Sequence, residues 1–239
     1  HLAAARHAAW PRHNGPMALY TATVDVWQHH ARTARTTTVV PDGCCDLIWH
    51  ALPGQAPQWF VTDLADQRYD VPGTVDERYW GYRMQAGTSI DRARLLAAVA
   101  ARPGCDAADI LPLLHDCIRL DAPVHDALLA LADSPSVASA ARALGVAERT
   151  LQRVVRTGTG QPPAYWKRLA RLRRAARAIA QVPAQTPLQA ATLADTAADW
   201  GYVDQAHMTH EFRRWLGITP AVLREQPDMH VALAATGYG

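Results

Sequence analysis

Residues 193–221, LADTAADWGYVDQAHMTHEFRRWLGITPA, carry two apolar stripes at helical spacing, with Gly201 between them. The second stripe consists of Met208, Phe212, Trp215 and Leu216. Apolar residues at i, i+4, i+7 and i+8 predict a helix with one buried face. A glycine between two such segments predicts a tight turn. This stretch is therefore expected to fold as a helix-turn-helix.

The same arrangement occurs about 56 residues earlier, in SVASAARALGVAERTLQRVVRTGTG at residues 136–160. There Gly145 is the hinge, and both copies end in the pattern Gly-x-x-Pro-Ala, at residues 160–164 and 217–221. A repeat of helix, glycine turn, polar-faced helix and a shared closing pattern indicates two helix-turn-helix units in tandem.

A long helix is predicted between the two units, from Pro162 to Ala180, because proline is favoured in the first turn and the segment is rich in Ala, Leu and Arg. About 18 helical residues at about 1.5 Å each span about 27 Å. Two units held about that far apart can enter successive major grooves, which lie about 34 Å apart on one face of DNA.

The charge is distributed unevenly along the 239 residues, although the net charge is only +2. Residues 136–226 hold 13 Lys/Arg against 6 Asp/Glu, whereas residues 1–135 hold 11 against 15. A basic segment attached to a mildly acidic one is typical of a nucleic-acid-binding domain joined to a domain with another task. A solvated basic surface is the alternative that charge alone leaves open.

The first part of the chain, to about residue 88, predicts β-strands, because β-branched and aromatic runs alternate with Pro and Gly turns. The runs are LYTATVDVW, TTTVV, CDLIWH, QWFVTDL and RYWGYRMQ. A helix follows, capped by Ser89 or Asp91 and ended by Pro103 and Gly104, and a second short helix runs from Asp106 to His115. We therefore expect an α+β domain, mainly β with one or two helices, then a linker at residues 119–124 and an all-α domain.

The carboxy-terminal half resembles the AraC/XylS family of bacterial transcription regulators. GVAERTLQRVVRTGTGQPPAYWKRLARLRRAARAI at residues 145–179 and LADTAADWGYVDQAHMTHEFRRWLGITPAVLR at residues 193–224 carry the resemblance. VVPDGCCDLIW and GYRMQAG are more loosely similar to stretches upstream of this domain in one subgroup. The resemblance implies an effector-binding or dimerisation domain at residues 1–123, a DNA-binding domain at 124–227 and a tail at 228–239.

The resemblance also implies which residues meet DNA. Those expected at base edges are Arg149, Gln152, Arg153, Gln205, Ala206, His207, Thr209 and His210. Those expected at phosphates are Arg156, Lys167, Arg168, Arg171, Arg213 and Arg214. Arg can bind guanine and Gln adenine in bidentate fashion, whereas phosphate contacts position the protein without reading sequence. At the start of the first recognition helix Ala147 cannot cap, a loss of about 1 kcal/mol, whereas Asp204 can cap the second.

The motif HMTHE at residues 207–211 also suggests a metal site, because His207 and His210 are neighbours on a helix. Zincin-type sites instead place two histidines at i and i+4 with the glutamate between them. Glu211 follows both histidines, so we expect a recognition-helix surface, no metal and no catalysis. Glu211 should avoid DNA phosphate and pair with an arginine such as Arg214 or Arg177.

The four cysteines, Cys44, Cys45, Cys105 and Cys117, lack the paired spacing of structural zinc sites. An effector pocket is assigned to Cys44, Trp49, Trp59 and Trp80, although Trp residues also suit an ordinary core. The alternative function is a bifunctional regulator whose Cys44 or Cys45 is a reactive thiol that accepts alkyl groups or senses redox state or metal.

The expected partners and cell compartment follow from the interpretation as a DNA-binding regulator. Double-stranded DNA is the main partner, and a small-molecule effector, RNA polymerase and a second copy in a homodimer are left open. No cofactor is expected. The chain has no apolar run long enough for a membrane helix and its first residues lack a secretory signal, so we expect a cytoplasmic protein without a membrane partner.

Overall fold

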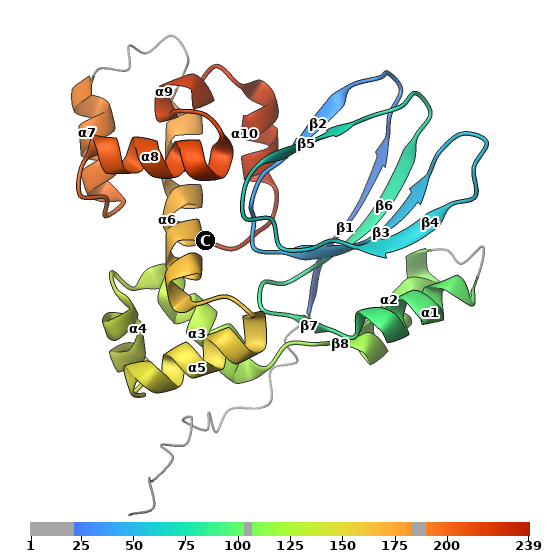
Figure 1. Cartoon of the computed structure of the whole chain (residues 1–239), viewed down its shortest axis with the longest axis horizontal. Coiled ribbons are helices and arrows are strands. Elements are labelled where there is room, and N and C mark those ends of the chain that lie inside the picture. The colour runs from blue at the N-terminus through green and yellow to red at the C-terminus, as the bar shows by residue number, and fades with distance from the viewer. Residues whose placement is uncertain (1–21, 103–106, 183–189) are drawn as a thin grey trace, which may run out of the picture.

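The computed structural model describes residues 22–102, 107–182 and 190–239. Strands dominate the first part and helices the second, as Figure 1 shows. We call residues 22–119 the sheet region and residues 122–239 the helical region. This order confirms the predicted fold class. Within the described ranges, no helix is both long enough and apolar enough to cross a membrane.

Four antiparallel strands form the main sheet, in the order β1-β6-β3-β4. They are β1 (Thr23–His30), β6 (Arg78–Met84), β3 (Cys45–Ala51) and β4 (Gln58–Val61). Two smaller pairs join β2 (Thr36–Val39) to β5 (Tyr69–Pro72) and β7 (Ser89–Ile90) to β8 (Ile118–Arg119). The strands β1, β2, β3, β4 and β6 match the predicted runs, except that the expected start of β1 at residues 19–21 lies outside the described residues, whereas the short strands β5, β7 and β8 were not predicted.

One face of the main sheet is covered by α1 (Arg92–Ala100) and α2 (Ala107–Cys117). Leu47 and Tyr82 are register partners on this face and pack with Leu95 of α1 and Leu114 of α2. Asp91 caps α1 by accepting a hydrogen bond from the Arg94 backbone at 3.1 Å, as predicted. The predicted end of α1 at residues 103–104, the start of the second helix at residue 106, and Cys105 lie outside the described residues.

The opposite face carries Trp27, whose indole lies over Gly81 of the neighbouring strand. A Cβ at Gly81 would lie 2.0 Å from the Trp27 ring, so only glycine leaves room for it. The indole Nε1 donates to Asp46 Oδ1 at 2.8 Å. Asp46 is also bound by Arg83, which connects this face to the helical region.

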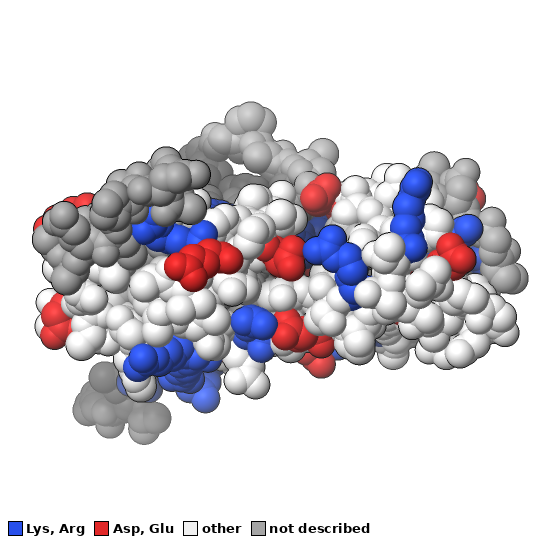
Figure 2. All heavy atoms as spheres, turned by 90° about the horizontal axis from the view of Figure 1, so that it is seen from above, with Lys and Arg blue, Asp and Glu red and all other residues white. Residues whose placement is uncertain are grey.

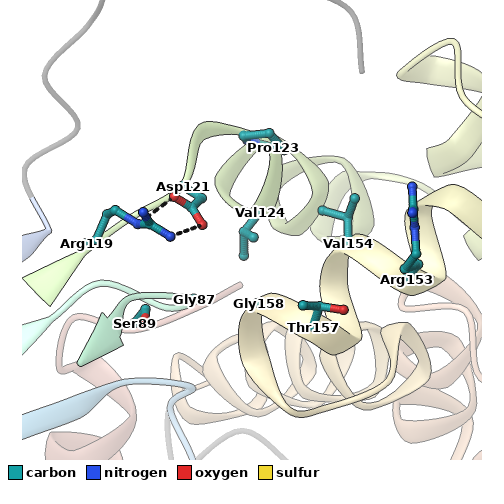
Figure 3. A pocket seen from close by; sticks show the side chains of 10 residues that line it. All are labelled: Gly87, Ser89, Arg119, Asp121, Pro123, Val124, Arg153, Val154, Thr157 and Gly158. Carbon is teal, nitrogen blue, oxygen red and sulfur yellow. Dashed lines mark hydrogen bonds and ion pairs between the residues drawn. The ribbon is translucent and has the colours of Figure 1, made fainter. Parts of the chain in front are cut away.

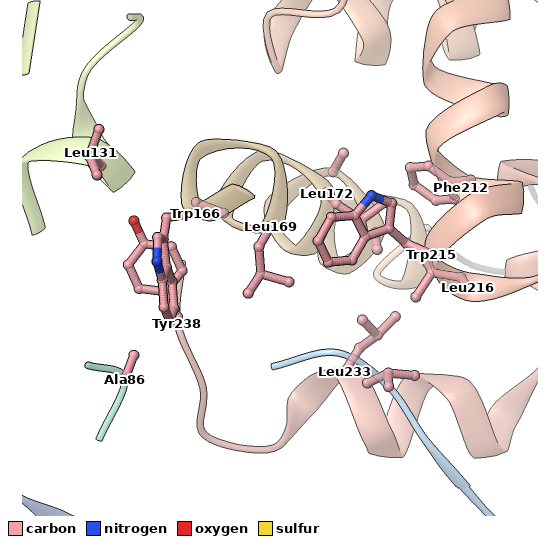
Figure 4. Close-up of a cluster of buried hydrophobic side chains, with 14 of the residues drawn as sticks. Ala86, Leu131, Trp166, Leu169, Leu172, Phe212, Trp215, Leu216, Leu233 and Tyr238 are labelled. Carbon is pink, nitrogen blue, oxygen red and sulfur yellow. The ribbon is translucent and has the colours of Figure 1, made fainter. Parts of the chain in front are cut away.

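The helical region is built around α6 (Pro163–Ala180), the long helix that the sequence predicts. The other helices are α3 (Ala122–Asp133), α4 (Val137–Ala143), α5 (Glu148–Thr159), α7 (Ala190–Asp199), α8 (Gln205–Leu216), α9 (Pro220–Leu223) and α10 (Pro227–Ala234). Figure 4 shows Leu172 of α6 near Phe212 and Trp215 of α8, and Trp166 beside Tyr238. One continuous apolar core thus joins both predicted units to α6.

Two segments differ from the sequence-based expectation. The expected linker at residues 119–124 includes the start of α3, because Pro123 occupies the first turn of a helix and Val124 is buried in the main core. The expected tail contains α10, whose Met229 and Leu233 are buried in the core around α6. Proline is favoured in the first turn of a helix, so residues 119–124 also suit a helix start, whereas α10 is short and weakly amphipathic and gives little periodic signal.

Candidate nucleic-acid interface

The first candidate recognition helix, α5, has an apolar back and a polar front. Leu151 and Val155 are fully buried. The side chains expected to contact bases and the neighbouring phosphate are all exposed: Arg149, Gln152, Arg153 and Arg156. Gln152 donates to Glu148 one turn earlier at 3.1 Å, which holds its amide against the helix. Ala147 stands at the N-cap without a side-chain hydrogen bond, as predicted.

The second candidate recognition helix, α8, begins with the predicted cap. Asp204 accepts a hydrogen bond from the His207 backbone at 2.7 Å. Ala206 and His210 are exposed, whereas Gln205 and Thr209 are half-buried. Met208, Phe212 and Trp215 form the buried back of the helix. The polar front of α8 is therefore narrower than that of α5.

The HMTHE motif is divided between the surface and the interior. His207 Nδ1 accepts a hydrogen bond from the Val203 backbone at 3.4 Å, and its Nε2 lies 3.7 Å from Glu211 Oε1. His210 points to solvent from the exposed side of α8. Within the described part of the chain, no three His, Cys, Asp or Glu residues are grouped so as to hold a metal ion.

Glu211 connects α8 to α6 rather than facing the surface. It is 6% exposed and accepts a hydrogen bond from Arg171 at 2.7 Å. Arg171 also donates to Gly201 O at 3.1 Å and lies 4.3 Å above the Tyr202 ring. The expectation that Glu211 pairs with Arg214 or Arg177 is wrong, because this side of α8 faces the middle of α6. Arg177 instead donates to Leu233 O and Gly239 O.

Four of the six cations expected at phosphates are exposed: Arg156, Arg168, Arg213 and Arg214. Arg168 is exposed but its Nε also lies 3.9 Å from Glu211 Oε1, and Lys167 and Arg171 have partners inside the protein. Lys167 donates to the carbonyls of Leu131 and Ser134 at the end of α3, and burial together with Arg171 and Arg174 lowers its pKa. A cation that completes the carbonyl end of a helix is not available to phosphate without breaking that contact.

Seen from above, the surface shows how charge is arranged over the two regions. Figure 2 shows a group of Lys and Arg side chains at one edge of the helical half, while acidic and basic side chains mix across the middle. A group of cations at one edge suits a surface that approaches a polyanion.

The residues expected to form an effector pocket lie in two places. Trp49 is the register partner of both Trp59 and Trp80, so the three indoles form one row across β4, β3 and β6. Trp59 and Trp80 pack against the core beneath α1 and α2. Cys44 precedes β3, where its backbone donates to Asp42 at 2.9 Å, and its side chain is buried.

Burial also governs the chemistry of the two adjacent thiols. It raises the pKa of Cys44 to about 12 and that of Cys45 to about 11. The thiolate is the nucleophile and the metal ligand, so a thiol with such a pKa is poorly reactive near neutral pH. Low reactivity favours the regulator without a functional thiol over the alkyl-acceptor or sensor alternative.

Native Cys44 and Cys45 should react with iodoacetamide at pH 7 at least about 100-fold more slowly than in the urea-unfolded chain, because at most roughly one thiol in ten thousand is ionised in the fold. Mass spectrometry of peptides quenched over time gives the two rates. Equal rates in the native and unfolded chain, or methyl transfer to either cysteine from alkylated DNA, would instead support a reactive thiol.

A groove of about 540 Å³ lies between the sheet region and α5. Figure 3 shows Arg119 and Asp121 at one end of it and Arg153, Val154 and Thr157 at the other, with Val124 between them. Arg119 and Asp121 form an ion pair at 2.9 Å. The groove thus combines an apolar wall with polar groups at both ends, and one end is the polar front of α5.

One exposed side chain beside α8 was missed by sequence reasoning. Val203 stands between buried Tyr202 and the cap Asp204, and it is 87% exposed. An apolar residue immediately before a recognition-helix cap was the available signal, although such a residue often packs against the first turns of its helix. Val203, Ala206 and His210 are all exposed in the turn before α8 and in its first two turns.

Comparison with known proteins places a named domain in this region. A family profile described as "Helix-turn-helix domain" matches residues 140–226, which confirms the resemblance over that range. No curated protein matches the chain. A transcriptional regulator with an AraC-type DNA-binding domain from Chromobacterium violaceum is 23% identical, over 48% of this chain and 95% of that one, with a TM-score of 0.37. ToxT from Vibrio cholerae is 10% identical, over 84% and 98% respectively, with a TM-score of 0.41.

Proposed function

We propose that this chain, in which residues 140–226 form an AraC-type helix-turn-helix domain, is a sequence-specific and effector-responsive regulator of transcription. One observation carries the proposal: α5 and α8 each present polar side chains outward while their apolar backs pack into the same core around α6. Figure 1 shows the two helices at different heights along α6. Two reading surfaces on one rigid support suit two successive major grooves.

The first unit supplies the more specific base contacts in this proposal. Arg149 and Arg153 can each bind guanine O6 and N7, and Gln152 can bind adenine N6 and N7 once it leaves Glu148. All three are exposed on one side of α5. Arg153 has a central place in the proposal because it borders both this surface and the groove.

The second unit supplies a smaller and more apolar surface. His210 and Thr209 offer hydrogen-bonding atoms, and Gln205 lies in the first turn of α8. Ala206 and Val203 present methyl groups, which suit the methyl group of thymine. His207 is assigned a supporting role, because its ring nitrogens already face Val203 and Glu211.

The exposed cations beside the two units are assigned to phosphates: Arg156, Arg168, Arg213 and Arg214. Nothing in the positions of these four arginines selects a base edge over a phosphate. Phosphate contacts fix the register of the protein on the duplex and supply most of the salt-dependent affinity.

Effector response is proposed to act through the groove beside α5. Small-molecule sites favour domain interfaces and volumes of about 300–1,000 Å³, and the groove volume of about 540 Å³ lies in that range. A ligand there would contact Arg153 or Thr157 and so change the population of DNA-competent states. The row of Trp49, Trp59 and Trp80 remains a second proposed effector surface, and a homodimer and a contact with RNA polymerase stay predictions.

A salt series on DNA binding tests the proposal. With four phosphate contacts, the logarithm of the association constant should fall with the logarithm of salt concentration with a slope of about −3.6. Fluorescence anisotropy with genomic fragments selected for binding, and with shuffled fragments of the same composition, gives both the slope and the specificity. A flat salt dependence, or equal affinity for selected and shuffled DNA, would contradict the function.

A further inference from the structure

Residues 235–239, which we call the latch segment, leave α10 and run between the sheet region and α6. Its Tyr238 is buried, and each part of that residue contacts a different element. The Tyr238 backbone donates to Asp42 O at 2.8 Å, and its hydroxyl donates to Leu128 O of α3 at 2.8 Å. Its ring meets Trp166 of α6 edge to face, with centroids 5.0 Å apart. Figure 4 shows the two side chains next to each other. One residue therefore joins the sheet region through its backbone, and the first helix of the helical region and α6 through its side chain.

Three arginines bind the backbone carbonyls of the latch segment. Arg83 of β6 donates to Thr236 O at 2.8 Å and also forms an ion pair with Asp42 at 3.2 Å. Arg173 donates to Ala235 O at 3.0 Å, and Arg177 donates to Gly239 O at 2.6 Å. Since one arginine comes from the sheet and two from α6, the segment is held from both sides.

The latch segment is tightly packed at Gly237. A Cβ there would lie 2.7 Å from Arg173 Nη2 and 2.9 Å from both Asp42 Cβ and Asp42 O. Asp42 O is backbone and cannot yield as a flexible side chain can. Any larger residue at this position must therefore displace the segment from its seat.

A buried cation, Arg173, lies beneath the latch segment and contacts both the segment and the sheet region. Arg173 is 0% exposed and donates to Pro41 O of the sheet region at 3.2 Å as well as to Ala235 O. Its Nε is buried without a hydrogen-bond partner within the described residues. Burial, and then Arg177, lower the pKa of Arg173 to about 10. A buried cation that loses a carbonyl partner is costly, so departure of the segment favours an opening that lets water reach Arg173.

We propose that the latch segment is an intramolecular latch, which holds the sheet region onto α6 and α3 and lets the two regions separate when it is released. A second interregion contact reports whether the regions are docked: the Arg68 backbone donates to Trp215 O at 2.7 Å, far along the chain from the segment. Release of the latch should therefore also weaken the hydrogen bond between the Arg68 amide and Trp215 O near the end of α8. The closed latch thus couples conformational changes of the sheet region to the second helix-turn-helix unit, and its release removes this coupling.

The test compares the parent chain with four variants. Gly237→Val ejects the segment by steric conflict, Tyr238→Ala removes its anchor, and deletion of residues 235–239 removes all its contacts without adding bulk. Thr236→Ala is the matched control, because Arg83 binds the Thr236 carbonyl and that residue is exposed. Hydrogen exchange of the Arg68 amide and thermal unfolding followed by calorimetry are measured for each.

The control should match the parent chain, with one unfolding transition. Each of the other three should exchange the Arg68 amide about tenfold faster or more, because local opening no longer requires release of the latch. They should also unfold in two separate transitions. If the deletion and Tyr238→Ala keep one transition and parental exchange at Arg68, the latch is wrong. Neither measurement involves DNA, so the outcome does not depend on the proposed function.

Discussion

Alanine in place of Arg153 is expected to weaken binding to the selected DNA by about 1–3 kcal/mol, and to relax preference at one or two base pairs. The expectation follows from the exposed position of Arg153 on α5, opposite the buried Leu151 and Val155. A lost bidentate contact to guanine removes discrimination as well as affinity. The measurement is anisotropy on the selected fragment and on single-base variants across the site.

Arg213→Ala is the matched control, because Arg213 is exposed on α8 but assigned to phosphate. It should weaken all sequences alike and reduce the salt slope by about one unit. The fold should be unaffected by either change, since neither side chain is buried. If the two variants lose affinity equally on every sequence, the division into base-reading and phosphate-binding residues fails.

The helices that decide the fold could be predicted because their signal is local. Gly145 and Gly201, at the two hinges, both adopt positive φ, and the apolar stripes of α5 and α8 are buried as their spacing indicates. Asp204 caps α8 and Ala147 leaves α5 uncapped, because capping depends on whether the single residue at the N-cap has a side chain that accepts a hydrogen bond. Each of these features depends on residues within one or two helical turns.

The direction of the basic side chains could not be predicted in the same way. The arginines and lysine of α6 raise the charge of the helical region, but several of them bind carbonyls inside the protein. Whether an arginine of a long helix meets solvent or a neighbouring element depends on what packs against that side. Sequence-based counting of charge therefore overstates the surface available to DNA.

Positions set by long-range pairing were also beyond sequence reasoning. Trp49, Trp59 and Trp80 share a row only because β4, β3 and β6 pair in one register. The role of the segment after α10 depends on Asp42 and Leu128, which are more than a hundred residues away from Tyr238. Such contacts leave no periodic signal in the sequence.

Alanine in place of Glu211 is expected to destabilise the fold by about 2–3 kcal/mol. Breaking a buried ion pair by removing one partner costs about 3–5 kcal/mol, and partial solvent access to Arg171 reduces that figure. Arg171 keeps Gly201 O and the Tyr202 ring but loses its carboxylate at 2.7 Å. Denaturant unfolding gives the free energy. Because the pair ties α8 to α6, binding should also weaken most at base pairs read by the second unit.

Two further changes separate the ion pair from a general effect of losing an acidic residue. Glu225→Ala removes an exposed carboxylate and should change stability by no more than about 0.5 kcal/mol. Arg171→Ala, combined with Glu211→Ala in a double-mutant cycle, should give a coupling energy of at least about 1 kcal/mol, since each partner is costly mainly when the other is left alone. A coupling near zero would mean that the Arg171–Glu211 pair does not hold α8 to α6, and that the buried Phe212, Trp215 and Leu216 together with the longer Arg168–Glu211 contact do so.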